Sequence, residues 1–178
     1  MIPLLLALAL QTAPVVPPGE KAVDAYVQSN ANAGAAPMKD DATFKAFHGM
    51  DGLKRISGAF VDANMADPRV KEIFKDSDTV RLKRTLSEQF CYLLGGGCTY
   101  TGRDMLAAHK GQGAQATDFN AIVENLQAAM DAERVPFAAQ NRLLAKLAPM
   151  ERVVVERKDP QAIKSLQKRV QAMMAPKE

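Results

Sequence analysis

The sequence is poor in the residues that mark several common classes of protein. It has no tryptophan, two cysteines and two histidines among 178 residues. The chain is long enough to bury a hydrophobic core without disulfides, so it is not a small disulfide-held scaffold. Its 23 basic and 20 acidic residues are scattered, with no dense Lys/Arg block interleaved with aromatic residues. We therefore expect one domain with tails and no nucleic-acid partner.

The apolar run near the amino terminus, Ile2 to Leu10, is too short to span a bilayer as a helix. It is similar to the core of a secretory signal and is followed by small residues near Ala13, although no basic residue precedes it. We expect residues 1–13 to be a signal segment and the protein to be periplasmic or secreted. The alternative is a cytoplasmic protein with a buried or disordered start.

The segments on either side of the domain differ in composition. Residues 14–41 are rich in Pro, Ala, Asn and Gly, which predicts a flexible linker with one short helix near Val23 to Val27. The folded domain is expected over 42–157. Apolar residues at helical spacing predict an amphipathic helix within the tail, 158–178, packing on the domain. Contact of this tail with a membrane surface or a partner is the alternative.

Within the domain, apolar residues recur at helical spacing, and no alternating run of strand length stands out. We therefore expect an all-α fold. Gly95 to Gly97 predict the end of one helix, and Pro149 should kink the last one. The predicted helices cover 44–47, 53–65, 69–74, 80–94 and 102–109, followed by one with its cap at Thr117 or Asp118 and one from Pro136 to about Val154.

One of the two histidines ends a very short apolar segment in the stretch 95–113, GGGCTYTGRDMLAAHKGQG. Neutral imidazole is a ligand for haem iron, and such a ligand needs apolar walls and a partner for its other ring nitrogen. His109 has candidates for both, because the Met105 carbonyl lies one helical turn earlier and small apolar residues stand between. Lys110 is a candidate cation for a haem propionate.

Other chemistries fit these residues less well. Cys91, Cys98 and His109 match no common zinc-ligand spacing, and no motif marks an activated thiol. Gly95 to Gly97 follow a helix and lack a GK[ST] motif, which indicates a helix end and not a phosphate-binding loop. Cys91 and Cys98 could form a disulfide across the glycines, or remain one core thiol and one loop thiol.

Four motifs in order resemble the truncated haemoglobins, most closely the first group: FK at 74–75, RLK at 81–83, GGGCTYTGRDM at 95–105 and HKGQG at 109–113. The resemblance covers 44–155. It implies a two-over-two helical sandwich around haem b, which would bind O2, CO or NO reversibly at an iron held by His109. The second and third groups resemble each other in having a tryptophan at the position of Ile122. The lack of tryptophan in this chain therefore fits the first group.

The resemblance also implies roles for individual residues. His109 matches the proximal iron ligand, and Phe74 matches a phenylalanine that packs on the porphyrin face. The candidates for contacts with the haem propionates at the rim are Tyr100, Arg81, Lys83 and Lys110. The other expected pocket residues are apolar: Phe60, Val61, Leu82, Leu86, Phe90, Met105, Phe119, Ile122 and Leu126.

This chain departs from the first group on the side where gas binds. That group usually has a tyrosine on its second helix and a glutamine on the helix that begins here near residue 80, and both donate hydrogen bonds to oxygen. The matching residues are Val61 and Leu86, with Leu82 beside them. A missing buried donor costs about 1 kcal/mol or more. We therefore expect fast oxygen release or easy autoxidation, and comparatively firm CO binding.

These departures bear on the choice between functions. Gas binding is favoured over an enzymatic role, because NO dioxygenation needs oxygen to be held and peroxidase chemistry needs a distal acid–base residue. The alternatives are a globin-fold interaction or sensor protein without haem, and a haem protein for electron transfer or NO detoxification. No reductase partner can be named. His48, the second histidine, is expected to be exposed and structural.

Overall fold

The computed structural model describes residues 16–156, and within that range the fold is all-helical, as predicted. The expected signal segment, 1–13, and the expected helix of the tail, 158–178, lie outside the described residues. The elements are η1 (Asn30–Ala33), α1 (Ala42–Ala46), α2 (Gly49–Ala66), α3 (Lys71–Phe74), α4 (Thr79–Leu93), α5 (Met105–His109), α6 (Ala116–Ala132), α7 (Phe137–Leu147), η2 (Ala148–Met150) and α8 (Glu151–Val154).

Helix α4 begins and ends within one residue of the predicted bounds, 80 and 94. The Asp78 carboxylate caps it by accepting a hydrogen bond from the backbone N–H of Arg81 at 3.0 Å. After its last residue, Gly95 takes a positive φ of 81°, a conformation that glycine adopts without strain. Helix α2 likewise ends at Ala66, before Asp67 and the proline that follows it.

Several predicted helix starts are wrong. Helix α2 begins at Gly49, before the predicted start at 53. Helix α5 begins at Met105 and not at 102, because the side chain of Asp104 caps it through the backbone N–H of Ala107 at 3.0 Å. Helix α6 begins directly after Gln115 and not at Thr117 or Asp118. Asp118 instead lies in the first turn, where its carboxylate accepts a hydrogen bond from the backbone N–H of Gln115 at 2.9 Å.

Pro149 interrupts the last helical stretch, as predicted. Helix α7 ends at Leu147, the short 3-10 turn η2 contains the proline, and α8 follows directly. Proline lacks the N–H that would continue the α-helical bonding pattern, which explains the break.

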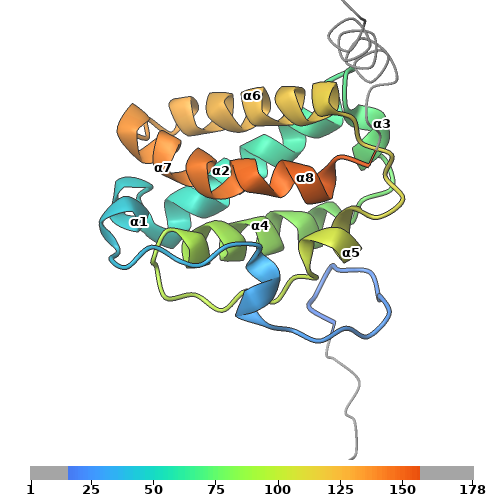
Figure 1. Cartoon of the computed structure of the whole chain (residues 1–178), viewed down its shortest axis with the longest axis horizontal. Coiled ribbons are helices and arrows are strands. Elements are labelled where there is room, and N and C mark those ends of the chain that lie inside the picture. Colours follow the sequence, from blue (N-terminus) through green and yellow to red (C-terminus); the bar gives the residue numbers. More distant parts are fainter. Residues whose placement is uncertain (1–15, 157–178) are drawn as a thin grey trace, which may run out of the picture.

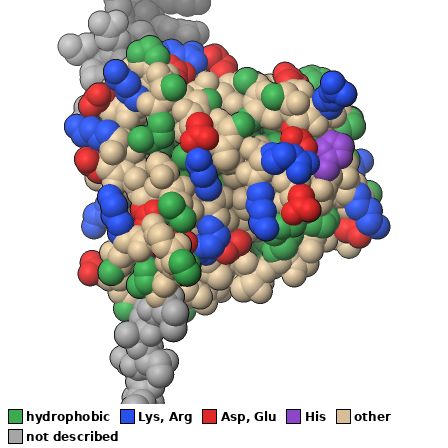
Figure 2. All heavy atoms as spheres, turned by 180° about the vertical axis from the view of Figure 1, so that it is seen from behind, with side chains coloured by type: hydrophobic (Ala, Val, Ile, Leu, Met, Phe, Trp, Pro, Cys, Tyr) green, Lys and Arg blue, Asp and Glu red, His purple; other side chains and the backbone are tan. Residues whose placement is uncertain are grey.

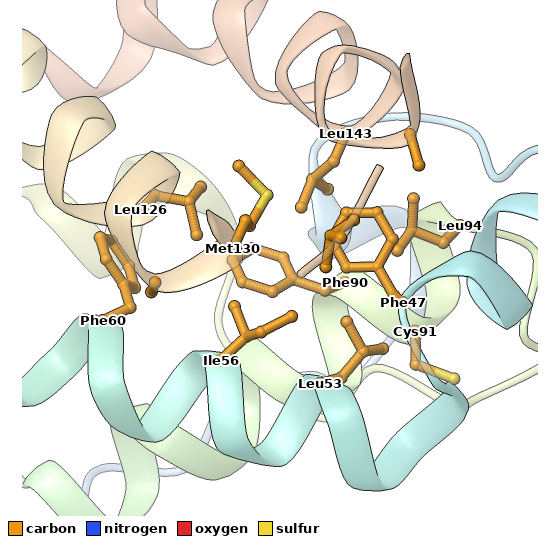
Figure 3. Packing of buried hydrophobic residues seen from close by; sticks show 13 residues of the cluster. Phe47, Leu53, Ile56, Phe60, Phe90, Cys91, Leu94, Leu126, Met130 and Leu143 are labelled. Carbon is orange, nitrogen blue, oxygen red and sulfur yellow. The ribbon is translucent and has the colours of Figure 1, made fainter. Parts of the chain in front are cut away.

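The helices form a two-over-two sandwich. Helix α2 packs against both α4 and α6, and α5 packs against α8. In Figure 1, α6 and α4 lie along opposite edges, with α2 and the α7–α8 stretch between them. The core residues point inward from these helices and contact one another: Phe47, Leu53, Ile56, Phe60, Phe90, Leu126, Met130 and Leu143 (Figure 3).

The outer surface carries charges of both signs. On the face shown in Figure 2, Lys and Arg side chains are interspersed with Asp and Glu side chains. Among residues 16–156, no helix has the length and apolar character needed to cross a bilayer.

Residues 16–41 contact the domain along α4 and α5, and we call them the N-terminal strap. The helix expected near Val23 to Val27 is absent, and the short turn η1 follows instead. The strap lies on the side of α4 and α5 that faces away from α6 (Figure 1). The segment whose composition suggests a flexible linker is thus in contact with the folded domain, with Ala33 fully buried.

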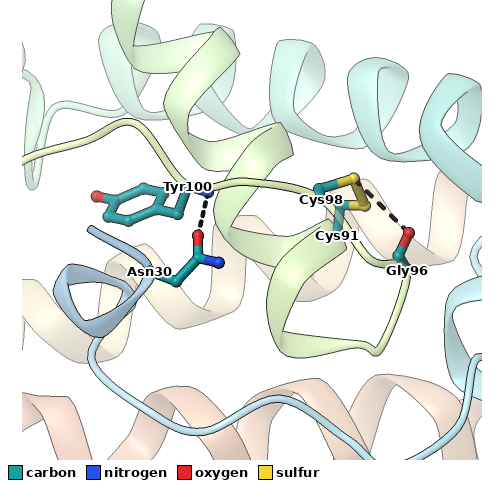
Figure 4. The surroundings of a disulfide bond; sticks show 5 residues. All are labelled: Asn30, Cys91, Gly96, Cys98 and Tyr100. Carbon is teal, nitrogen blue, oxygen red and sulfur yellow. Dashed lines mark hydrogen bonds between the residues drawn. A yellow bond between two sulfur atoms is a disulfide. The ribbon is translucent and has the colours of Figure 1, made fainter. Parts of the chain in front are cut away.

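Cys91 and Cys98 form a disulfide, with their Cα atoms 5.7 Å apart (Figure 4). The bond joins the last turn of α4 to the loop that leads toward α5. Of the two possibilities that the sequence leaves open, the structure therefore has the disulfide. Its short closed loop restricts the unfolded chain around the three glycines.

We expect reduction of this disulfide to lower the free energy of unfolding by about 2 kcal/mol, because a short closed loop in the unfolded chain is released. Chemical denaturation of the wild type with and without reductant measures the change. The double variant Cys91→Ala/Cys98→Ala serves as the control, since it should not respond to reductant. Equal denaturation midpoints for oxidised and reduced wild type would contradict the prediction.

Candidate functional site

A cavity of about 220 Å³ opens between α4, α5, α6 and the α7–α8 stretch. Its wall is mostly apolar, and it contains one imidazole. The lining residues are Phe60, Phe74, Ser77, Leu82, Thr85, Leu86, Gln89, Phe90, Tyr100, Met105, Ala108, His109, Gln112, Ala114, Phe119, Ile122, Val123, Leu126, Leu147, Met150 and Val154.

His109 is the last residue of α5 and is half-buried in the cavity wall. Its Nδ1 lies 2.7 Å from the backbone carbonyl oxygen of Met105. A carbonyl can only accept, so Nδ1 carries the proton and donates, which leaves the Nε2 lone pair of the neutral ring free. Nε2 makes no hydrogen bond to any residue that the structure describes. This is the form of imidazole that binds a metal ion.

The loop after His109 is held by Glu156, which lies just past the end of α8. The carboxylate of Glu156 accepts hydrogen bonds from the backbone N–H groups of Gly111, at 2.5 Å, and Gly113, at 2.7 Å. The backbone N–H of Glu156 in turn donates to the carbonyl of Ala114 at 3.0 Å. His109 is therefore held by its own helix before it and by the hydrogen bonds of Glu156 to the loop after it.

Three of the polar side chains that line the cavity, those of Thr85, Tyr100 and Gln89, use their donor groups within the protein. The Thr85 hydroxyl donates to the Arg81 carbonyl at 3.0 Å, and the Tyr100 hydroxyl donates to the Arg103 carbonyl at 3.0 Å. Burial raises the pKa of Tyr100, so its hydroxyl keeps its proton.

Gln89, the third such residue, lies among sulfur atoms. Its amide donates to the carbonyl of Ala33 at 3.0 Å, and the same nitrogen lies 3.4 Å from the Met105 sulfur. The N–H groups of Gln89 are therefore already engaged.

Most of the residues predicted for the pocket do meet at this cavity. Four do not: Val61 is buried in the core beyond the wall, and Lys110 is exposed just after α5. Arg81 is paired with Glu20 at 2.9 Å, and Lys83 with Asp62 at 2.6 Å. The predicted residues that line the cavity are Phe60, Phe74, Leu82, Leu86, Phe90, Tyr100, Met105, His109, Phe119, Ile122 and Leu126.

Several lining residues were not predicted. Thr85 and Gln89 follow Leu82 and Leu86 at helical spacing on α4, so the periodicity of that helix could have found them. Met150 and Val154 reach the cavity only because the chain bends at Pro149, and no local pattern signals this contact.

The donor set suits a flat apolar macrocycle better than a bare metal ion. Among residues 16–156, no group of three or more His, Cys, Asp and Glu side chains could hold a metal ion. A single imidazole in an apolar wall could hold a metal ion only if a cofactor supplied the remaining ligands, as a haem would. The residues at this cavity therefore fit a haem, whose iron His109 would hold.

Comparisons with known proteins agree with this geometry. The family model described as bacterial-like globin matches residues 42–156. The group 1 truncated haemoglobin of Tetrahymena pyriformis is 34% identical over 92 residues, which cover 52% of this chain and 76% of that protein. The corresponding protein of Tetrahymena thermophila is 33% identical over the same shares.

Solved structures show the same fold. The crystal structure of the truncated haemoglobin from Tetrahymena pyriformis in its Fe(III) form aligns with a TM-score of 0.61 at 29% identity, covering 65% of this chain and 98% of that chain. The 2/2 haemoglobin of Synechococcus sp. PCC 7002, solved with covalently attached haem, aligns with a TM-score of 0.59 at 23% identity over the same shares. By its sequence, its helical sandwich and its cavity, this chain belongs to the bacterial-like globins and, within them, to the group 1 truncated haemoglobins.

Proposed function

We propose that the chain binds haem b through His109 and reversibly binds a diatomic gas in the same cavity. One observation carries the proposal: the bond from His109 Nδ1 to the Met105 carbonyl places the proton of the neutral ring on Nδ1, so that the Nε2 lone pair is available in an apolar cavity. When bound, haem supplies an iron atom with an open coordination position for O2, CO or NO.

The chain's own residues hold and shield the cofactor. The Met105 carbonyl fixes the tautomer and the plane of the imidazole, which raises its basicity as a ligand. Large apolar side chains such as Phe74, Phe90 and Phe119 form walls that exclude water from the cavity.

His109→Ala should abolish stable haem binding. We expect wild type reconstituted with hemin to show a Soret band at one haem per chain. Losing the hydrogen-bond partner of a metal ligand typically weakens metal binding by roughly 10–100-fold. Because this variant loses the ligand itself, its affinity for hemin should fall by more than that. Absorption titration with hemin measures both.

His48→Ala is the matched control. His48 is exposed, and its Nε2 lies 3.2 Å from the carbonyl oxygen of Glu133, away from the cavity. The control should titrate like wild type. A wild type without a Soret band, or a His109→Ala protein with an unchanged one, would overturn the proposal.

We propose that the wall that α4 forms on the gas side of the cavity offers no free hydrogen-bond donor. Leu82 and Leu86 line the cavity from α4, and the donors of Thr85, Gln89 and Tyr100 are engaged within the protein. Oxygen gains from a buried donor, whereas carbon monoxide needs none. We therefore propose fast oxygen release, which disfavours a dioxygenase role.

Leu86→Gln should slow oxygen dissociation about fivefold or more, because one buried hydrogen bond contributes about 1 kcal/mol. Leu86→Met is the control, since it keeps a similar volume without adding a donor. Stopped-flow measurement of oxygen and carbon monoxide dissociation should show a change for oxygen in the Gln variant alone. Equal oxygen rates in the two variants would contradict the proposal.

We further propose that the protein is periplasmic or secreted. Two observations support this: the apolar run Ile2 to Leu10, and the disulfide between Cys91 and Cys98, since disulfides persist in oxidising compartments. Cell fractionation with intact-mass measurement should find the oxidised protein, shortened near Ala13, in the exported fraction. Full-length protein with free thiols in the cytoplasm would contradict it.

A further inference from the structure

We infer that the N-terminal strap, residues 16–41, is a positioning element for His109. It holds the loop that leads into α5 and contacts Met105 itself, so it sets the strength of the iron–histidine bond and the retention of haem. The inference rests on the proposed haem binding through His109.

Two asparagines of the strap bind the loop before α5. The side-chain oxygen of Asn30 accepts a hydrogen bond from the backbone N–H of Tyr100 at 2.8 Å (Figure 4). The side-chain amide of Asn32 donates to the carbonyl of Gly102 at 3.2 Å. These bonds fix the backbone shortly before the first residue of α5, Met105.

A tyrosine of the strap adds two contacts to the same loop. The Tyr26 hydroxyl donates to the carbonyl of Thr101 at 2.8 Å. The guanidinium of Arg103 lies over the Tyr26 ring, 5.4 Å from its centroid, where a cation is attracted to the aromatic face. The strap thus contacts an unbroken run of loop residues from 100 to 103.

The strap also packs directly behind Met105. The Ala33 carbonyl accepts the hydrogen bond from Gln89, and Gly34 follows with a positive φ of 85°. A Cβ atom at Gly34 would lie 2.9 Å from Met105 Cγ and 2.8 Å from Met150 Cε, so only glycine fits without displacing a side chain. Met105 is the residue whose carbonyl holds the His109 ring.

A buried ion pair anchors the far end of the strap. The Glu20 side chain is 1% exposed and bonds Arg84 Nε at 2.5 Å and Arg81 Nε at 2.9 Å. The hydrogen bond from Arg84 lowers the pKa of Glu20, which is therefore charged at neutral pH. Arg84 also donates to the Thr101 hydroxyl at 2.5 Å, so one guanidinium joins the strap, α4 and the loop.

The strap lies outside the range, 42–156, that the globin family model matches. Helix α5 has five residues, and so short a helix is not stable on its own. Restraints on its flanking loops therefore decide how rigidly His109 is held. In this chain, part of that restraint comes from a segment added to the shared fold.

The test is the double variant Asn30→Leu/Asn32→Leu, which removes the two bonds to the loop. Asn30→Asp keeps the acceptor oxygen for Tyr100 and is the conservative variant. Asn141→Leu is the matched control, because Asn141 is exposed on α7 and makes no hydrogen bond to the described residues. Each holoprotein is measured by resonance Raman spectroscopy of the ferrous state and by haem transfer to apomyoglobin.

We expect the double variant to lose haem on the order of tenfold faster and to show a shifted iron–histidine stretching frequency. Asn30→Asp and the control should match wild type. The double variant could instead melt at a lower temperature while its iron–histidine frequency and its rate of haem loss stay unchanged. The strap would then be merely structural, and the inference would fail while the proposed function stands. A wild type that binds no haem would remove the proposed function instead.

Discussion

The structure depends on one hydrogen bond, from the His109 ring to the carbonyl of Met105, 2.7 Å long. It selects one tautomer of the imidazole and aims one free nitrogen lone pair. Both residues belong to the same five-residue helix, which is too short to hold this geometry alone. The precision of the site must therefore come from what surrounds α5.

Three separate parts of the chain supply that support. The carboxylate of Asp104 caps the helix, that of Glu156 holds the glycine loop after it, and the N-terminal strap holds the loop before it. Most of these contacts involve backbone groups, which cannot rotate away as side chains do. In the strap, the negative charge of the buried Glu20 carboxylate is balanced by the guanidinium groups of Arg81 and Arg84.

Polar groups at the cavity are also hydrogen-bonded within the protein. Polar side chains reach the cavity, yet the donors of Thr85, Gln89 and Tyr100 are engaged with backbone carbonyls. Their buried polar groups are thus satisfied without the cofactor, which keeps the fold stable. The consequence is an apolar chamber beside a single basic nitrogen, the combination from which the proposed chemistry follows.

Local sequence was sufficient for the features that depend on neighbouring residues. Helical spacing predicted the all-α fold, Pro149 predicted the break, and four-residue spacing placed Met105 beneath His109. The motifs of the family added the pocket residues on α4 and α6. The predictions from helical spacing and from proline were confirmed because helix geometry and proline restraint act over one or two turns.

Only the tertiary structure decided the contacts between distant segments. Arg81, a candidate for a propionate by its motif, pairs with Glu20, and a segment with the composition of a linker holds the loop before α5. The bend at Pro149 brings Met150 into the cavity, 61 residues from Gln89. No local pattern encodes such contacts, because they form only when the helices have packed and brought these side chains within reach of one another.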